Sequence, residues 1–161
     1  MSEDVLFARV DESDSLDMAQ AEEAVNTSKY LIFITDDLKF GIDADYVVEI
    51  ITNHIITYLP MLPDFVRGII NLRGQMIPIV DMRRRLGKQD KNDCLVIVLN
   101  INGTQIGILV DAVDQMIDIP HASILPMPSQ SAQELVSGMC SLPDGSGTML
   151  VLSCDQLLPH D

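Results

Sequence analysis

The sequence predicts a mostly β protein made of two small five-stranded barrels in tandem, with short helices and a shared hydrophobic core. Three observations lead to this class: short β-branched runs alternate with tight turns, no long helical period is present, and the pattern of the first half returns in the second. Five short strands without helices to cover them are expected to curl and so remove their exposed edges.

The repeat is visible in matched segments whose separation grows slowly along the chain. Leu31–Ile34 corresponds to Leu95–Val98 at an offset of 64 residues, and Ile79-Val80 corresponds to Val151-Leu152 at an offset of 72. A slow drift in one direction is expected when a unit has been duplicated and its loops have since gained residues. The chain is therefore interpreted as a duplicated unit.

The predicted domain plan follows from this repeat and from the charge distribution. Residues 1–28 hold eight acidic residues against Arg9 alone, half of the chain's net charge of −14, and are expected to form a flexible tail. One domain is expected over 29–161, with strands of the first barrel at about 29–87 and of the second at about 92–158. Halves this small have little core of their own, which predicts a large shared interface with a groove along it.

Two further segments precede the central hairpin of the first half. The runs YLIFIT and LKFGID predict two strands around a turn at Asp36-Asp37. The chain continues as a long, β-branched segment, Val47–Tyr58, which Pro60 and Pro63 break.

The central hairpin is predicted over Val66–Leu72 and Gln75–Val80, joined by a tight turn at Arg73-Gly74. Glycine accepts a positive φ without steric cost, so Gly74 at the second central position favours a type II or type I′ turn. Arg73 then lies at the tip. Whether its guanidinium meets a partner, folds back onto a carboxylate or is simply solvated stays open from the residues alone.

The remaining elements follow in order. Asp81 is expected to cap a short helix over Met82–Leu86 that Gly87 ends. The runs CLVIVLN and TQIGILV predict a hairpin around Asn102-Gly103, and Asp144–Gly147 is expected to be another hairpin turn.

Composition excludes several classes of function. A pI near 4.3 argues against nucleic acid and anionic membranes as partners, because both require Lys and Arg. The sequence lacks a secretory start and an apolar run of roughly 18 residues, so a cytoplasmic location is expected. Cys94, Cys140 and Cys154 lack CxxC spacing and are expected to be reduced thiols, mostly buried.

No motif in the sequence supports catalysis, a metal or a cofactor. HExxH, Walker and GxSxG patterns are absent, and the three histidines are far apart in sequence. Arg83-Arg84-Arg85 is interpreted as the exposed face of the short helix. An enzyme that uses clustered carboxylates is the minor alternative to a binding module without a small-molecule substrate. The carboxylates concerned are Asp43, Asp45, Glu49, Asp111, Asp114 and Asp118.

The run VRGIINLRGQMIPIVD, from Val66 to Asp81, closely resembles the signature of the CheW family of bacterial chemotaxis adaptors. The resemblance covers about Tyr30 to Leu158 and includes FGI at Phe40, VVEI at Val47, and GILVD ending at Asp111. It departs at Leu152–Asp155, where the family more often has a plain apolar run into Asp.

The resemblance implies two SH3-like barrels and a non-enzymatic scaffold. Such a scaffold couples transmembrane chemoreceptors (methyl-accepting chemotaxis proteins) to the histidine kinase CheA in two-component signal transduction. The implied partners are the CheW-like regulatory domain of CheA and the cytoplasmic receptor tips, which would recruit the protein to the inner face of the membrane. Weak self-association in signalling arrays stays open, as do the kinase-binding residues. The alternative within the fold is an adaptor of a parallel chemosensory kinase pathway for surface motility or gene regulation.

In the family, the helical tip of the receptor docks in the groove between the two barrels. Carried over to this sequence, that groove involves Val47, Arg73, Gly74 and Val113, with Glu49 on the same strand as Val47. Val47 and Val113 would supply apolar anchors for an amphipathic helix. A hypothesis follows: Glu49 pairs with Arg73 across neighbouring strands and holds the guanidinium in place.

Overall fold

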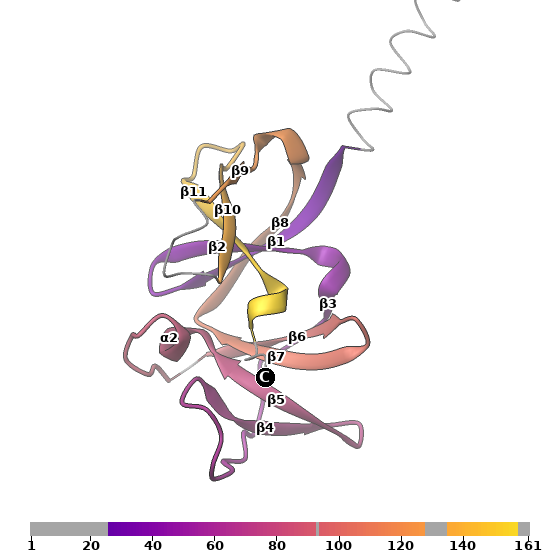
Figure 1. Ribbon diagram of the computed structural model, residues 1–161, viewed down its shortest axis with the longest axis vertical. Coiled ribbons are helices and arrows are strands. Elements are labelled where there is room, and N and C mark those ends of the chain that lie inside the picture. Colours follow the sequence, from indigo (N-terminus) through magenta and orange to yellow (C-terminus); the bar gives the residue numbers. More distant parts are fainter. Residues whose placement is uncertain (1–25, 93, 128–134, 158–161) are drawn as a thin grey trace, which may run out of the picture.

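The computed structural model describes residues 26–92, 94–127 and 135–157, and these residues form two β-sheets that lie one above the other (Figure 1). The mostly β class is therefore confirmed. The tail expected at 1–28 lies outside the described residues up to position 25. The strands are β1 Thr27–Thr35, β2 Leu38–Asp43, β3 Val47–Ile51, β4 Val66–Leu72, β5 Gln75–Asp81, β6 Leu95–Ile101, β7 Thr104–Val110, β8 Ala112–Pro120, β9 Leu125–Pro126, β10 Val136–Ser141 and β11 Thr148–Leu152.

The helical elements are short. In the described part of the chain they are the helix α2 (Met82–Arg85) and three 3₁₀ turns at Ala44–Tyr46, His121–Ser123 and Cys154–Gln156. Among the described residues, no helix is long and apolar enough to cross a membrane.

The two sheets exchange strands between the halves of the chain. One sheet has the order β8-β1-β2-β11-β10-β9, and the other has the order β3-β6-β7-β5-β4. If β1 to β5 are matched in turn with β6, β7, β8, β10 and β11, the two orders become the same, apart from the two-residue β9. The repeat read from the sequence is therefore present in the topology. The expected division of the strands into one barrel at 29–87 and another at 92–158 is not present in the topology. The strands β1 and β2 belong instead to the six-stranded sheet, with β8 to β11 of the second half.

The hairpin turns follow the chemistry of their residues. Arg73 and Gly74 have φ values of 53° and 85°, and Asn102 and Gly103 have 53° and 88°. Two successive positive φ values define a type I′ turn, which matches the twist of the flanking strands. Of the two turn types expected for Arg73-Gly74, type II and type I′, the structure has type I′.

The hydrophobic core is shared, as expected. Its largest cluster takes Phe33 and Phe40 from the six-stranded sheet and Ile97 and Ile108 from the five-stranded sheet, all fully buried. Two smaller clusters each belong to one sheet. Burying the central cluster removes apolar surface of both sheets from water at once, so separating the sheets would expose this largest cluster.

The long β-branched segment Val47–Tyr58 forms a strand only at its start. The strand β3 ends at Ile51, and the chain continues as a loop in which Thr57 alone pairs with β4, through two hydrogen bonds with Ile69 of 2.8 and 2.9 Å. β-branched residues favour strands only where a partner strand and a buried face exist, and this loop supplies neither for most of its length.

Candidate functional site

An ion pair joins two of the residues that the sequence singled out. Arg73 Nη1 donates to Glu49 Oε1 at 2.7 Å, and Nη2 donates to Oε2 at 3.3 Å, so the predicted pairing of the two side chains is confirmed. The expectation that they lie on neighbouring strands is wrong, because three strands separate β3 from β4 in the sheet order. The Arg73 side chain is 73% exposed and that of Glu49 is 27% exposed. An exposed pair contributes less than about 1 kcal/mol to stability, so its main physical effect is to fix the direction of the guanidinium.

The same pair connects the two edges of the five-stranded sheet. Glu49 is on β3 at one edge, and Arg73 follows β4 at the other edge. The sheet must therefore curl until its edge strands approach each other. The Arg73-Gly74 turn sits at this meeting point, held from one side by Glu49 and from within by Asn71, whose Oδ1 accepts from the Gly74 amide at 3.0 Å.

Gly74 leaves the turn open to solvent. A Cβ built on Gly74 would meet nothing within 4 Å. The φ of 85° still favours glycine, because other L-residues adopt it only with strain. Gly74 is thus required by the backbone of the turn, and its lack of a side chain leaves the space beside Arg73 free.

Val47 and Val113 come from different sheets. Val47 begins β3, Val113 lies on β8 opposite Phe33, and both are half-buried against the central core cluster. Among the described residues, no hydrogen bond or ion pair joins β8 to the Arg73-Gly74 turn. The structure thus joins Glu49 with Arg73 directly, and relates Val47 to Val113 only through the core between the sheets.

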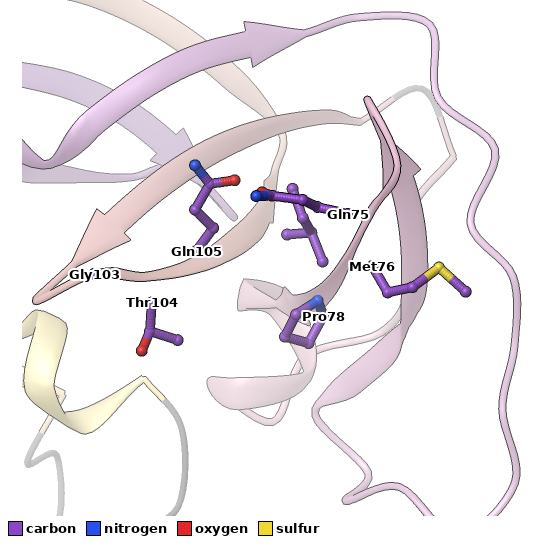
Figure 2. Close-up of a pocket in the computed structure, with 7 residues that line it drawn as sticks. Gln75, Met76, Pro78, Gly103, Thr104 and Gln105 are labelled. Carbon is purple, nitrogen blue, oxygen red and sulfur yellow. The ribbon is translucent and has the colours of Figure 1, made fainter.

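A pocket of about 530 Å³ opens next to the turn (Figure 2). It lies where β5 and β7 diverge, because their parallel pairing begins only at Ile79 and Gly107. Figure 2 shows the carboxamides of Gln75 and Gln105 on one side of the pocket, with Met76 pointing away. The pocket's lining is Gln75, Met76, Ile77, Pro78, Gly103, Thr104 and Gln105.

A family model described as the CheW-like domain matches residues 29–161. The chain belongs to the CheW family. Chemotaxis protein CheW from Klebsiella aerogenes is 33% identical over 140 residues, which is 83% of this chain and 82% of that protein. Protein FrzA from Myxococcus xanthus is 27% identical and covers 88% of this chain and 92% of its own length.

A solved structure shares the fold. The scaffolding protein TtCheW from Thermoanaerobacter tengcongensis superposes with a TM-score of 0.71 at 31% identity, over 78% of this chain and 88% of that one. The SH3-like CheW fold expected from the resemblance is therefore confirmed for this chain.

This CheW-family chain exposes apolar side chains on β3 and in the loop that follows it. On β3, Val48 and Ile50 point outward and are 44% and 41% exposed, while Val47, Glu49 and Ile51 alternate with them. The loop after β3 continues the series with Ile55, Tyr58, Leu59 and Met61. Large exposed apolar groups of this kind are typical of surfaces that bind other proteins. The sequence did not single them out, because a β-branched run by itself does not show which of its side chains lack a packing partner.

The arginines of α2 differ from the expectation. Arg83 is not on an exposed face: its Nε and Nη2 donate to Asp111 at 2.8 and 2.7 Å, and its side chain is 17% exposed. Arg85 lies over the Phe65 ring at 4.7 Å and donates to the Gln156 carbonyl. These arginines therefore anchor α2 to the body of the protein.

The Arg83–Asp111 pair also ties the two sheets together. Asp111 Oδ2 accepts from the backbone amide of Asp36, which lies in the β1–β2 turn of the other sheet, at 2.9 Å. The hydrogen bonds from Arg83 and then from Asp36 hold the pKa of Asp111 below its ordinary value. One sequence signal could have found this network: Asp81 and Asp111 each end a buried apolar run, and a carboxylate in that position needs a partner.

The other sequence-predicted groups have ordinary structural roles. Asp81 caps α2 by accepting from the amides of Arg83 and Arg84, as predicted. All three cysteines are free thiols, Cys140 and Cys154 buried and Cys94 half-buried. Burial raises the pKa of Cys154 to about 12, so its thiol stays protonated at neutral pH.

Proposed function

We propose that this chain is a non-enzymatic scaffold that couples transmembrane chemoreceptors to the histidine kinase CheA. Membership of the CheW family supports this function, as do relatives named Chemotaxis protein CheW and a solved relative described as a scaffolding protein. Recruitment from the cytoplasm to the inner face of the membrane, through the receptors, belongs to the same proposal.

The observation that carries the proposal is the Arg73–Glu49 pair at the meeting edges of the sheet. A receptor tip is a helical hairpin, and a helix that docks on a protein needs apolar anchors together with a rigid polar group that sets its register. Val47 and Val113 are half-buried apolar residues suited to the first role. Arg73, fixed by Glu49 and next to the open Gly74, is suited to the second.

The exposed apolar side chains of β3 and its loop supply a second surface. A scaffold must bind the kinase and the receptor at the same time, so it needs surface beyond the receptor site. Apolar edge and loop residues give contacts of modest strength, and several such contacts in one array combine through avidity.

Co-sedimentation tests the proposed receptor site. The chain is mixed with receptor-containing membranes, and the bound fraction is measured for the native protein, for Arg73→Glu and for a control, Lys29→Glu. Lys29 is exposed on β1, and its replacement changes the charge by the same amount. We expect Arg73→Glu to lose at least about tenfold in affinity, a factor worth 1.4 kcal/mol, and Lys29→Glu to bind nearly as the native chain does. Equal binding of both variants would remove Arg73 from the site.

An adaptor of a parallel chemosensory kinase pathway is the second candidate. The relative named Protein FrzA supports this candidate, because this chain covers 92% of that protein and its name is not that of a chemotaxis protein CheW. The discriminating experiment is to measure which kinase and which receptors of the native cell co-purify with the chain.

A further inference from the structure

The pocket beside the Arg73-Gly74 turn is a gap between two strands that pair with each other further along. The strands β5 and β7 are parallel neighbours from Ile79 and Gly107 onward, and the residues before this point line the pocket. Figure 2 shows Pro78 on one wall and Gln105 on the other. This space, the β5–β7 gap, owes its binding properties to the strand edges on its two walls, and these do not depend on the proposed function.

The six-stranded sheet shows the pairing that the gap lacks. There β2 and β11 hold the places that β7 and β5 hold in the five-stranded sheet. Their parallel ladder begins at Lys39 and Met149. With the offset of 72 residues between β5 and β11, Met149 corresponds to position 77, two residues before Ile79, where the ladder of β5 begins. The repeated unit can therefore close this gap, and the five-stranded sheet leaves it open.

Pro78 accounts for the open gap. At the same offset, its counterpart in β11 is Leu150, which lies within the ladder and has an N–H to contribute to it. Proline has no N–H, so β5 cannot continue its ladder toward β7 through residue 78. A proline inside a strand that has neighbours on both sides is otherwise rare, because it leaves a ladder hydrogen bond unmade.

Met76 and Gln105 direct backbone groups into the gap. In a hairpin with a two-residue turn, the residues that flank the turn exchange both hydrogen bonds, and the next pair exchanges none. Met76 and Gln105 belong to these next pairs, opposite Asn71 and Asn100. Their N–H and C=O groups therefore point away from their own hairpins, and no backbone partner for them occurs in the described part of the chain. Two donors and two acceptors thus face the gap.

An extended peptide complements these walls. Its backbone offers N–H and C=O groups in the same alternation, and pairing with an open strand edge is a common way of binding a peptide. The volume of about 530 Å³ is within the range of pockets that bury a small ligand, which corresponds to a few peptide residues.

We propose that the β5–β7 gap binds the chain's own segment Val5–Val10 as an extended strand. Its sequence, VLFARV, contains β-branched and aromatic residues and no acid, whereas the residues that follow it are rich in Asp and Glu. Residues 11–26 span roughly 50 Å when extended, and a compact domain of this size has a radius of gyration of roughly 14 Å, so the segment can reach the gap. Docking there brings Asp11 and Glu12 toward Arg73, whose side chain is 73% exposed, so the charges are complementary.

Amide hydrogen exchange of the full-length chain, followed residue by residue by NMR, tests the proposal. The first variant is Phe7→Asp, which disrupts the segment without touching the described residues. Its matched control is Leu16→Asp, which makes the same kind of change outside the segment. The second variant is Pro78→Leu, which gives β5 the residue that β11 has at the equivalent position and so restores the missing N–H.

We expect the amides of Met76 and Gln105 to exchange at least about tenfold more slowly in the native chain and in Leu16→Asp than in Phe7→Asp. In Pro78→Leu the amides of Val5–Val10 should lose their protection, because β5 and β7 then pair with each other. Equal exchange in the native chain and Phe7→Asp, equal acceleration by both tail variants, or an unchanged segment in folded Pro78→Leu would overturn the proposal. Protection that grows with protein concentration would also overturn it, since the occupant would then be a second copy of the chain.

Discussion

Replacing Asp111 by Ala should destabilise the protein far more than replacing any exposed acid. Asp111 accepts two hydrogen bonds from Arg83 and one from the amide of Asp36, and its side chain is 7% exposed. Removing one partner of a buried pair costs roughly 3–5 kcal/mol, because the other charge is left without compensation. The Arg83 side chain is 17% exposed, so water would partly solvate its charge after the replacement. We therefore expect a loss of stability at the lower end of this range, about 3 kcal/mol.

The assay is urea unfolding followed by circular dichroism, supported by thermal melts. For a chain of this size a loss of about 3 kcal/mol corresponds to a fall in Tm of roughly 6–12 °C. The matched control is Asp114→Ala, whose carboxylate is half-exposed and lies 3.5 Å from Lys39. That variant should lose less than about 1 kcal/mol.

A double-mutant cycle isolates the pair. If Arg83→Met is combined with Asp111→Ala, the second replacement should cost little, because no uncompensated charge remains, and the coupling should be about 2 kcal/mol. A loss for Asp111→Ala no larger than for Asp114→Ala would refute the reasoning. So would additive effects in the double variant, since either result would mean that the two sheets are not joined through this network.

Three further predictions follow from the same structure. Because the pKa of Asp111 is lowered in the folded protein, its contribution to stability is complete above its ordinary pKa of about 4 and is lost as the pH falls through the lower folded value. The free energy of unfolding should therefore fall less steeply with decreasing pH in Asp111→Asn than in the native chain. Glu49→Ala should change the free energy of unfolding by less than about 1 kcal/mol but weaken receptor binding, and full receptor binding with an unchanged Arg73 position would contradict the orienting role. Gly68→Ala should destabilise by roughly 1–3 kcal/mol in denaturant unfolding, because its Cβ would lie 2.4 Å from the Thr57 carbonyl oxygen; an unchanged midpoint would show that the loop yields freely.

The hairpins and the duplication could be predicted from the sequence because their signals are local. Asn102-Gly103 and Arg73-Gly74 specify their turns through residues that accept positive φ, and alternating apolar residues specify the strands beside them. The type I′ turn at Arg73-Gly74 needed the structure only to decide between two types.

The exchange of strands between the sheets could not be predicted. The same repeated sequence is compatible with two arrangements. In one, the hairpin of β1 and β2 joins the sheet of its own half, and in the other it joins the sheet that contains strands of the other half. The difference lies in the connection from β2 to β3, which is a three-residue 3₁₀ turn at Ala44–Tyr46. Its direction depends on the shared core, where Phe33 and Phe40 pack against the other sheet's residues, and not on local propensity.

The Glu49–Arg73 pair was found from the sequence only as a hypothesis that followed the family resemblance. The burial of Arg83 was missed because a run of three arginines on a short helix is usually solvated. Only the position of Asp111, brought from 28 residues away, shows that the first arginine has a buried partner.

The central claim is that the chain couples receptors to the kinase through the Arg73-Gly74 turn. The most direct measurement is autophosphorylation of CheA in the presence of receptor membranes, without the chain, with the native chain, and with Arg73→Glu. We predict activation by the native chain and loss of activation with Arg73→Glu at unchanged stability. Failure of the folded native chain to activate its cognate kinase, or full activation by Arg73→Glu, would contradict the claim.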